Sequence, residues 1–156
     1  MSGSNSHFDE RVLELIPHRP PMLLINKLLK VTESSSSALV VIDSEASFFQ
    51  ADKGVPAWVG LEYMGQTAAL IAGHQLQLGV VSPHLGFLLG TRTFTAECDY
   101  YETGKLKVSC REKAIVGDGL ATFECLIETY PQDAQQAECL ATATLSVFRR
   151  LLHEKV

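Results

Sequence analysis

Residues 56–78 constrain the fold more than any other part of the chain. Their sequence, PAWVGLEYMGQTAALIAGHQLQL, is apolar on nearly every side when it is wound as a helix. Pro56 suits the first turn of a helix, and Gly79 suits its end. Because a helix that is apolar all round must be covered by other structure, the sequence predicts a long central helix wrapped by the rest of the chain.

The segment before this helix predicts one short helix and two strands. Residues 8–15 place apolar side chains on one helical face, with Ser6 or Asn5 as the expected N-cap. Residues 22–33 and 38–49 are rich in Leu, Ile and Val and predict strands. The run of four serines between them predicts a hairpin turn.

The segment after the helix predicts four antiparallel strands. Apolar and polar residues alternate in 105–111, 121–128 and 141–147, which is typical of strands with one buried face. Turn-forming residues separate these stretches, and Gly117-Asp118-Gly119 favours a tight hairpin. The order of elements predicts an α+β hotdog fold, an antiparallel β-sheet wrapped around a long central α-helix, although order alone also suits other α+β folds.

Length and charge limit the classes of function. At 156 residues, the chain fits a single hotdog domain spanning 1–156, and we expect 1–7 to be a flexible N-terminus. Its net charge of −5 argues against nucleic-acid and anionic-membrane partners. No leader peptide is apparent, and no apolar run reaches the roughly 18–20 residues that span a bilayer. We therefore expect a cytoplasmic protein.

The cysteines favour buried, reduced thiols. They form no Cys-x-x-Cys pair and have no histidine at metal-ligand spacing, so we expect no metal site. Without a sign of secretion, disulfides are not expected either. The four residues are Cys98, Cys110, Cys125 and Cys139.

Glu62 is the main candidate for chemistry because it is the only charged side chain between Pro56 and Gly73. Burial raises the pKa of a carboxyl group, which then exchanges protons near neutral pH as a general acid or base. Gln66 follows one helical turn later and is placed to hydrogen-bond and orient this carboxyl group. A structural alternative is a glutamate paired with a buried arginine or with backbone amides.

The start of the helix offers a second chemical element. The backbone N–H groups of Ala57, Trp58 and Val59 are expected to be unpaired and to lie at the positive end of the helix dipole. A thioester oxygen that gains negative charge would be stabilised there. Every helix start offers such groups, so this feature gains weight only together with others.

Several segments resemble one enzyme family in the same order. The segment 16–27 (IPHRPPMLLINK) resembles the Leu-Pro-His-Arg-x-Pro-hydrophobic-Leu-Leu-x-Asp-Arg segment of FabZ-type 3-hydroxyacyl-(acyl carrier protein) dehydratases. Phe48-Phe49-Gln50, the helix motif 61–66 (LEYMGQ) and 87–92 (FLLGTR) follow in family order. The sequence of 55–64 (VPAWVGLEYM) is most similar to that of the ApeP-like thioester dehydrases of aryl polyene gene clusters.

This resemblance implies a hotdog dehydratase that acts in fatty-acid-like or aryl polyene biosynthesis. The family's catalytic glutamate falls on Glu62 and its helix glutamine on Gln66. The implied reaction converts a 3-hydroxyacyl thioester to a trans-2-enoyl thioester without a metal or redox cofactor. The substrate would be carried on the phosphopantetheine arm of acyl carrier protein, which would be a partner of this chain.

One departure from the family affects the expected mechanism. FabZ-type enzymes place Gly-His-Phe-Pro after the Phe-Phe pair and use that histidine as the base, whereas Phe49 is followed by QADKGVP. His18 is one replacement, since an imidazole titrates in the right range; alternatively, it is a loop histidine that fixes the entry to the first strand. Glu62 acting alone or through water is a second explanation, and a histidine from another subunit is a third.

The resemblance also implies an oligomer, because hotdog sheets commonly pair edge to edge. We expect a homodimer or higher oligomer, or a heterodimer with a second hotdog dehydratase.

Arg19 and other arginines either face a phosphopantetheine phosphate or an acidic carrier protein, or are solvated. Trp58 and Tyr63 are expected in a tunnel wall or the core. The less favoured histidines and the other arginines are His7, His74, His84, His153, Arg92, Arg149 and Arg150.

Two other functions fit the same residues. In a hotdog acyl thioesterase, the helix carboxylate would activate water against the thioester carbonyl and release free acid and thiol. In a non-catalytic or half-site subunit of a hetero-oligomeric dehydratase, the chain would bind an acyl group or support a catalytic partner. The missing Gly-His-Phe-Pro histidine motivates the second alternative.

Overall fold

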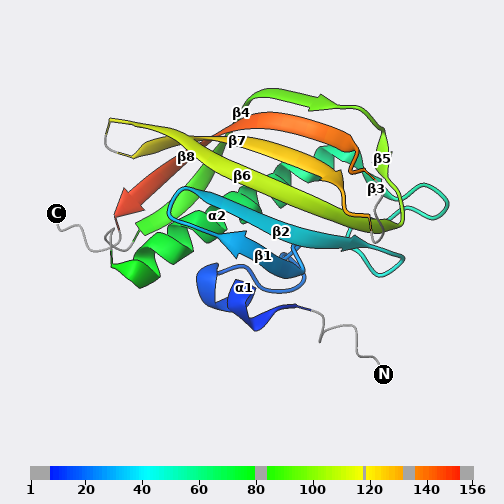
Figure 1. Ribbon diagram of the computed structural model, residues 1–156, viewed down its shortest axis with the longest axis horizontal. Helices are drawn as coiled ribbons and strands as arrows, with labels where there is room; N and C mark the ends of the chain where they lie inside the picture. The colour runs from blue at the N-terminus through cyan, green and yellow to red at the C-terminus, as the bar shows by residue number, and fades with distance from the viewer. Residues whose placement is uncertain (1–7, 80–83, 118, 132–135, 152–156) are drawn as a thin grey trace.

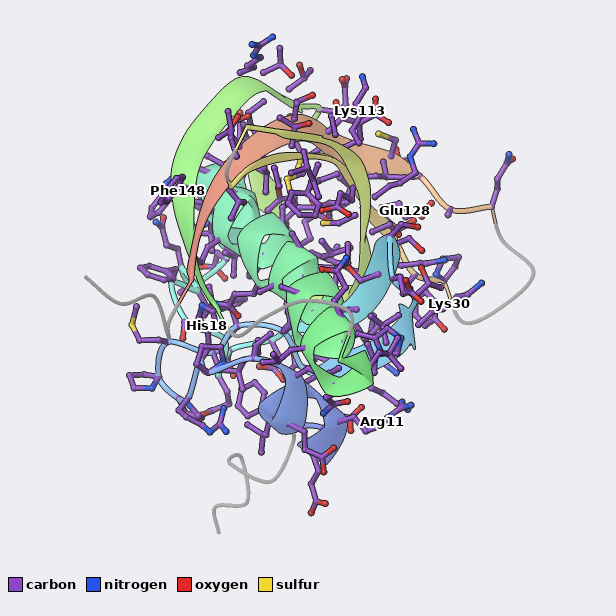
Figure 2. All side chains as sticks on the ribbon, turned by 90° about the vertical axis from the view of Figure 1, so that its left-hand side faces the viewer. Arg11, His18, Lys30, Lys113, Glu128 and Phe148 are labelled. Atoms are coloured by element: carbon purple, nitrogen blue, oxygen red, sulfur yellow. The ribbon has the colours of Figure 1, made fainter. Side chains whose placement is uncertain are left out.

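The predicted central helix is confirmed. A computed structural model describes residues 8–79, 84–117, 119–131 and 136–151. Helix α2 (Gly60–Leu78) follows a 3₁₀ turn, η2 (Ala57–Val59), and ends where Gly79 takes a left-handed conformation with φ of 75°. Figure 2 shows the sheet curling around α2, as the apolar character of the helix requires.

The wrapping layer is one antiparallel sheet. Its six strands run in the order β1-β2-β6-β7-β8-β4, so β1 and β4 are its edges (Figure 1). A separate two-stranded sheet joins β3 (Val55–Pro56) to β5 (Tyr100–Tyr101) beside the start of α2. The strands of the large sheet are β1 (Lys27–Val31), β2 (Ser35–Ile42), β4 (His84–Ala96), β6 (Gly104–Val116), β7 (Leu120–Thr129) and β8 (Cys139–Leu151).

The predicted hairpin is confirmed, but its turn lies earlier than the serine run predicts. Ser35–Ser37 belong to β2, and the chain reverses earlier, where the Thr32 hydroxyl accepts the N–H groups of Ser34 and Ser35 at 3.2 and 2.9 Å. Ser36 is buried because its hydroxyl donates to the Thr67 carbonyl of α2 at 2.6 Å. The hydrogen bond to the central helix therefore stabilises a buried serine within a strand. Local strand propensity does not reveal such a contact.

The short first helix is confirmed, but its predicted cap is wrong. Helix α1 (Glu10–Leu15) has Asp9 as its N-cap, whose carboxylate accepts the Arg11 N–H at 2.9 Å and the Leu28 N–H at 3.1 Å. The helix packs closely against α2, since a Cβ added at Gly73 would lie 2.0 Å from the Leu15 carbonyl oxygen. This contact ties the N-terminal segment to the central helix.

The cysteine prediction is half correct. Cys110 and Cys125 are buried, whereas Cys98 is half-buried and Cys139 is exposed.

No helix in the described part of the chain is both long and apolar enough to cross a membrane. Within the same residues, no group of three or more histidine, cysteine or acidic side chains is arranged to hold a metal ion.

Candidate active site

Glu62 lies in the first turn of α2. Its side chain is half-buried, and its Oε1 accepts a hydrogen bond from Gln66 Nε2 at 3.2 Å. The expected pairing one helical turn apart is therefore confirmed. Glu62 makes no ion pair with a lysine or arginine of the described residues, which argues against the structural alternative of a buried salt bridge.

Gln66 connects this carboxyl group to the loop before β1. It is 1% exposed, its Nε2 also donates to the Met22 carbonyl at 2.8 Å, and its Oε1 accepts the Leu24 N–H at 2.8 Å. A buried amide with all these bonds has one stable orientation. It holds the loop and the Glu62 carboxyl group in fixed positions relative to each other.

His18 lies on that loop and near Glu62. Burial lowers the pKa of His18, the negative charge of Glu62 opposes this shift, and the positive charge of Arg19 adds to it. Its Nδ1 is buried without a hydrogen-bond partner among the described residues. The Glu62 carboxylate is thus near enough to act electrostatically on His18, whose lowered pKa favours a neutral imidazole that can accept a proton.

Arg19 braces the loop that carries His18. Its guanidinium group donates to the carbonyl oxygens of Leu13, Ile16 and His18 at 2.8, 2.9 and 2.7 Å. These three bonds fasten the loop to the end of α1. The observed contacts therefore favour a structural role over the predicted contact with a phosphate or a carrier protein.

The prediction that the Ala57 N–H group is unpaired is wrong. Its N–H donates to the Asp99 carbonyl at 2.9 Å, because the small β3–β5 sheet brings that residue against the helix start. The Ala57 carbonyl in turn accepts the Tyr101 hydroxyl at 2.9 Å. Tyr101 also explains Gly60, where an added Cβ would lie 2.2 Å from the hydroxyl oxygen. Of the three amides expected to face substrate, only those of Trp58 and buried Val59 are left as candidates.

An exposed aromatic pair stands at the helix start and was missed from the sequence. Phe48 and Trp58 are 55% and 60% exposed, and their rings meet edge to face at 5.7 Å. Phe48 has φ of 69°, a conformation that costs energy in a bulky residue and persists only where surrounding structure holds it. Trp58 precedes Glu62 by one helical turn, so the pair borders the candidate site. Of the two places expected for Trp58, a tunnel wall or the core, its exposure excludes the core.

A cavity of about 550 Å³ lies beside the loop that holds His18. Tyr63 reaches it from α2, where the ring packs on Tyr101 at 5.9 Å, and burial raises the pKa of the Tyr63 hydroxyl. The cavity walls include Pro21, Leu23 and Val41. Because the walls come from segments distant in sequence, neither the cavity nor its size is readable from local pattern.

The remaining predicted residues add nothing to this cluster. His74 is half-buried on α2, three turns beyond Glu62, and Arg92 is exposed on the edge strand β4. His7 and His153 lie outside the described residues. The same holds for the side chains of His84, Arg149 and Arg150.

The family model of the ApeP-like dehydratases, described as "ApeP dehydratase", matches residues 10–155. The chain belongs to the ApeP-like family. Its hotdog fold and the Glu62–Gln66 pair are thus features of a member of a dehydratase family. No curated protein sequence shows significant similarity to the chain.

Solved structures share the fold of this ApeP-like chain. The dehydratase heterocomplex ApeI:P from Xenorhabdus doucetiae matches with a TM-score of 0.77 at 21% identity, covering 92% of this chain and 93% of that one. A thioesterase family protein from Silicibacter pomeroyi matches with a TM-score of 0.67 at 9% identity, covering 91% and 97%. The Escherichia coli PaaI protein of the phenylacetic acid degradation operon reaches 0.60 at 10% identity, covering 79% and 82%.

Proposed function

We propose that this ApeP-like chain is a hydro-lyase that converts a 3-hydroxyacyl thioester into a trans-2-enoyl thioester and water. The observation that carries the proposal is the tether from Glu62 through Gln66 to the loop of His18, together with the electrostatic effect of Glu62 on the His18 imidazole. A dehydration needs one group to take the C2 proton and one to protonate the departing hydroxyl group. The site offers one candidate for each task.

In the proposed mechanism, His18 is the base and Glu62 is the acid. The neutral imidazole removes the C2 proton, which the thioester carbonyl makes acidic, and the electron pair forms the C2–C3 double bond. Glu62 in its protonated form gives its proton to the C3 hydroxyl group, which leaves as water. The lowered pKa of His18 supports this division, since it keeps the imidazole free to accept a proton near neutral pH.

The acyl group would be delivered by acyl carrier protein on its phosphopantetheine arm, with no metal or redox cofactor. The N–H groups of Trp58 and Val59 at the helix start would stabilise the enolate-like oxygen. The exposed Phe48–Trp58 pair and the cavity lined by Tyr63, the residue after Glu62, supply apolar surface. These surfaces suit the apolar part of an acyl thioester.

We further propose that a second hotdog subunit completes the enzyme. Strand β4 is a 13-residue sheet edge without a partner strand on one side in the described sheet. Such a long free edge favours pairing with another chain. The structural match to a dehydratase heterocomplex supports a heterodimer, and a homodimer or higher oligomer is the alternative. If the heterodimer partner supplies the family's missing histidine, that histidine takes the place of His18 as the base.

The test is an assay for water loss from 3-hydroxyacyl-carrier substrates by mass spectrometry, with the protein alone and mixed with a hotdog dehydratase partner. Glu62→Gln keeps the side-chain size and removes the acid, so we expect a rate about 10²–10⁴-fold lower. Glu14→Gln, on an exposed residue of α1, is the control and should retain full activity. Retained dehydration by folded Glu62→Gln protein, alone and in the mixture, would refute the assignment.

The same assay separates the two rival functions. A thioesterase would release free acid and thiol instead of enoyl thioester, and the fold shared with a thioesterase family protein makes this product worth measuring. A supporting subunit would be inactive alone and would leave the mixture equally active after Glu62→Ala. If activity appears only in the mixture and Glu62→Ala abolishes it, the site is shared between subunits.

A further inference from the structure

A second concave site lies on the outer face of the sheet, away from the candidate active site. It is a depression of about 330 Å³ with small serine residues at its floor and long basic side chains around them. Figure 2 shows Lys30 on this outer face and His18 on the opposite side of the molecule. The groups that matter most are Lys30 of β1, Ser37 of β2, and Lys107, Ser109 and Arg111 of β6.

The sheet register makes these groups converge. Ser37 is paired with Lys30 on one side and with Ser109 on the other, so the three residues form one row across the strands. Lys107 and Arg111 lie two residues before and after Ser109 and therefore share its face of the sheet. Opposite side chains of neighbouring strands lie about 5 Å apart and alternate residues of one strand about 7 Å apart. Long lysine and arginine side chains span both distances.

Four polar side chains of the depression have no partner within the part of the chain that the structure describes. The hydroxyl groups of Ser37 and Ser109 have no hydrogen-bond partner among the described residues, although Ser37 is only 8% exposed. Lys30 and Lys107 make no ion pair within that part of the chain either. Two hydroxyl donors and two ammonium groups are thus available on one face of the sheet to an anionic ligand.

The one carboxylate that lines the depression is already neutralised. Glu124 of β7 forms ion pairs with Arg111 and, at 3.1 Å, with Lys113, and these partners lower the pKa of its carboxyl group. Glu124 and Glu128 border the basic groups on the β7 side, where Glu128 is paired with Lys107 in the register. This acidic border would repel a broad acidic protein surface as a ligand. A small anion that fits between β1 and β6 avoids this repulsion.

We propose that this depression binds one phosphate group of a phosphorylated ligand. The serine hydroxyls at the floor would donate to its oxygen atoms, and the Lys30 and Lys107 ammonium groups would neutralise its charge. The same chemistry is offered by a soluble phosphate ester and by the headgroup of an anionic phospholipid. The proposal is independent of the dehydratase reaction, because none of its residues touches the candidate active site.

The test is a titration of the ¹⁵N-labelled protein with inorganic phosphate, against sodium chloride at matched ionic strength, followed by amide chemical shifts. We expect saturable shifts confined to residues around Ser37 and Ser109. Lys30→Met/Lys107→Met should raise the Kd about tenfold or more, since two charge-assisted contacts are lost. Lys27→Met/Lys105→Met removes two lysines from the same strands outside the depression and is the matched control.

A second arm separates the two sources of phosphate. Phosphatidylcholine vesicles with and without phosphatidic acid are sedimented with the wild-type protein and with both double variants. Sedimentation that requires phosphatidic acid and is lost in Lys30→Met/Lys107→Met identifies a lipid headgroup, and saturation by inorganic phosphate alone identifies a soluble ligand. The proposal is overturned if neither probe binds, if shifts are spread over all basic residues, or if the two double variants weaken binding equally.

Discussion

The two sides of helix α2 differ in what covers them. On the side of the sheet, Met64 is fully buried and its carbonyl accepts the Cys110 thiol of β6 at 3.3 Å. Glu62 lies two residues earlier, about 200° around the helix, and faces the loop that carries His18. One side is covered by apolar strands, whereas the other is covered by an irregular loop held through Gln66.

This difference separates stability from chemistry within one helix. On the sheet side, the buried polar groups of Met64 and Thr67 are matched by Cys110 and Ser36. On the loop side, the Glu62 carboxyl group is half-buried and His18 Nδ1 has no partner among the described residues. Unsatisfied and titratable groups at a partly covered surface are typical of functional sites. The largest losses of stability on mutation are therefore expected on the sheet side, and smaller losses, together with changes in ionisation and activity, on the loop side.

The largest effect on stability is expected from Met64→Ala on the sheet side. The side chain is 0% exposed, so its loss leaves a cavity and should lower the free energy of unfolding by about 2–5 kcal/mol. Urea unfolding followed by circular dichroism measures the change. Leu78→Ala, on a 51% exposed residue of the same helix, is the control and should cost far less. Equal losses in the two variants would contradict the contrast between the covered and open parts of α2.

A smaller effect is expected from Gln66→Leu, which cuts the tether on the loop side. The change leaves the Leu24 N–H and the Met22 carbonyl without their partner, and we expect a loss of about 1–3 kcal/mol. Urea unfolding gives the stability, and amide hydrogen exchange at Leu24 should accelerate. Gln77→Leu, on an exposed residue of α2, is the matched control. Unchanged exchange at Leu24 would show that the loop is held by other contacts.

The sheet side could be predicted from sequence, because its signal is periodic. The apolar run at 56–78 and the alternation in the later strands gave the helix, the strands and their wrapped arrangement. The turn was predicted too late in the chain, because Ser36 lies in the strand with its hydroxyl bonded to the Thr67 carbonyl, a contact between residues far apart in the chain. Local propensity does not contain such a contact.

The loop side could be predicted only in part. Glu62 and Gln66 were readable as a lone carboxyl group with a neighbour one turn away on an apolar helix, and their hydrogen bond is observed. The proximity of His18 depends on how the loop before β1 crosses the helix, and the loss of the Ala57 amide depends on Asp99. The exposed Phe48–Trp58 pair also results from tertiary structure. No local sequence pattern specifies these contacts between distant segments of the chain.

The smallest effect, and the most specific for the loop side, is expected in the titration of His18. Burial holds its pKa below the ordinary value of 6.5, and the negative charge of Glu62 opposes that shift. Glu62→Gln removes the charge and should lower the pKa of His18 further, as measured from imidazole NMR shifts against pH; Glu14→Gln should leave it unchanged. Because the unfolded chain binds this proton more tightly, the contribution of His18 to stability is complete above pH 6.5 and is lost as pH falls through the lowered pKa. In Glu62→Gln this loss should extend to lower pH, and an unchanged or higher His18 pKa in that variant would mean that the two side chains do not share a site.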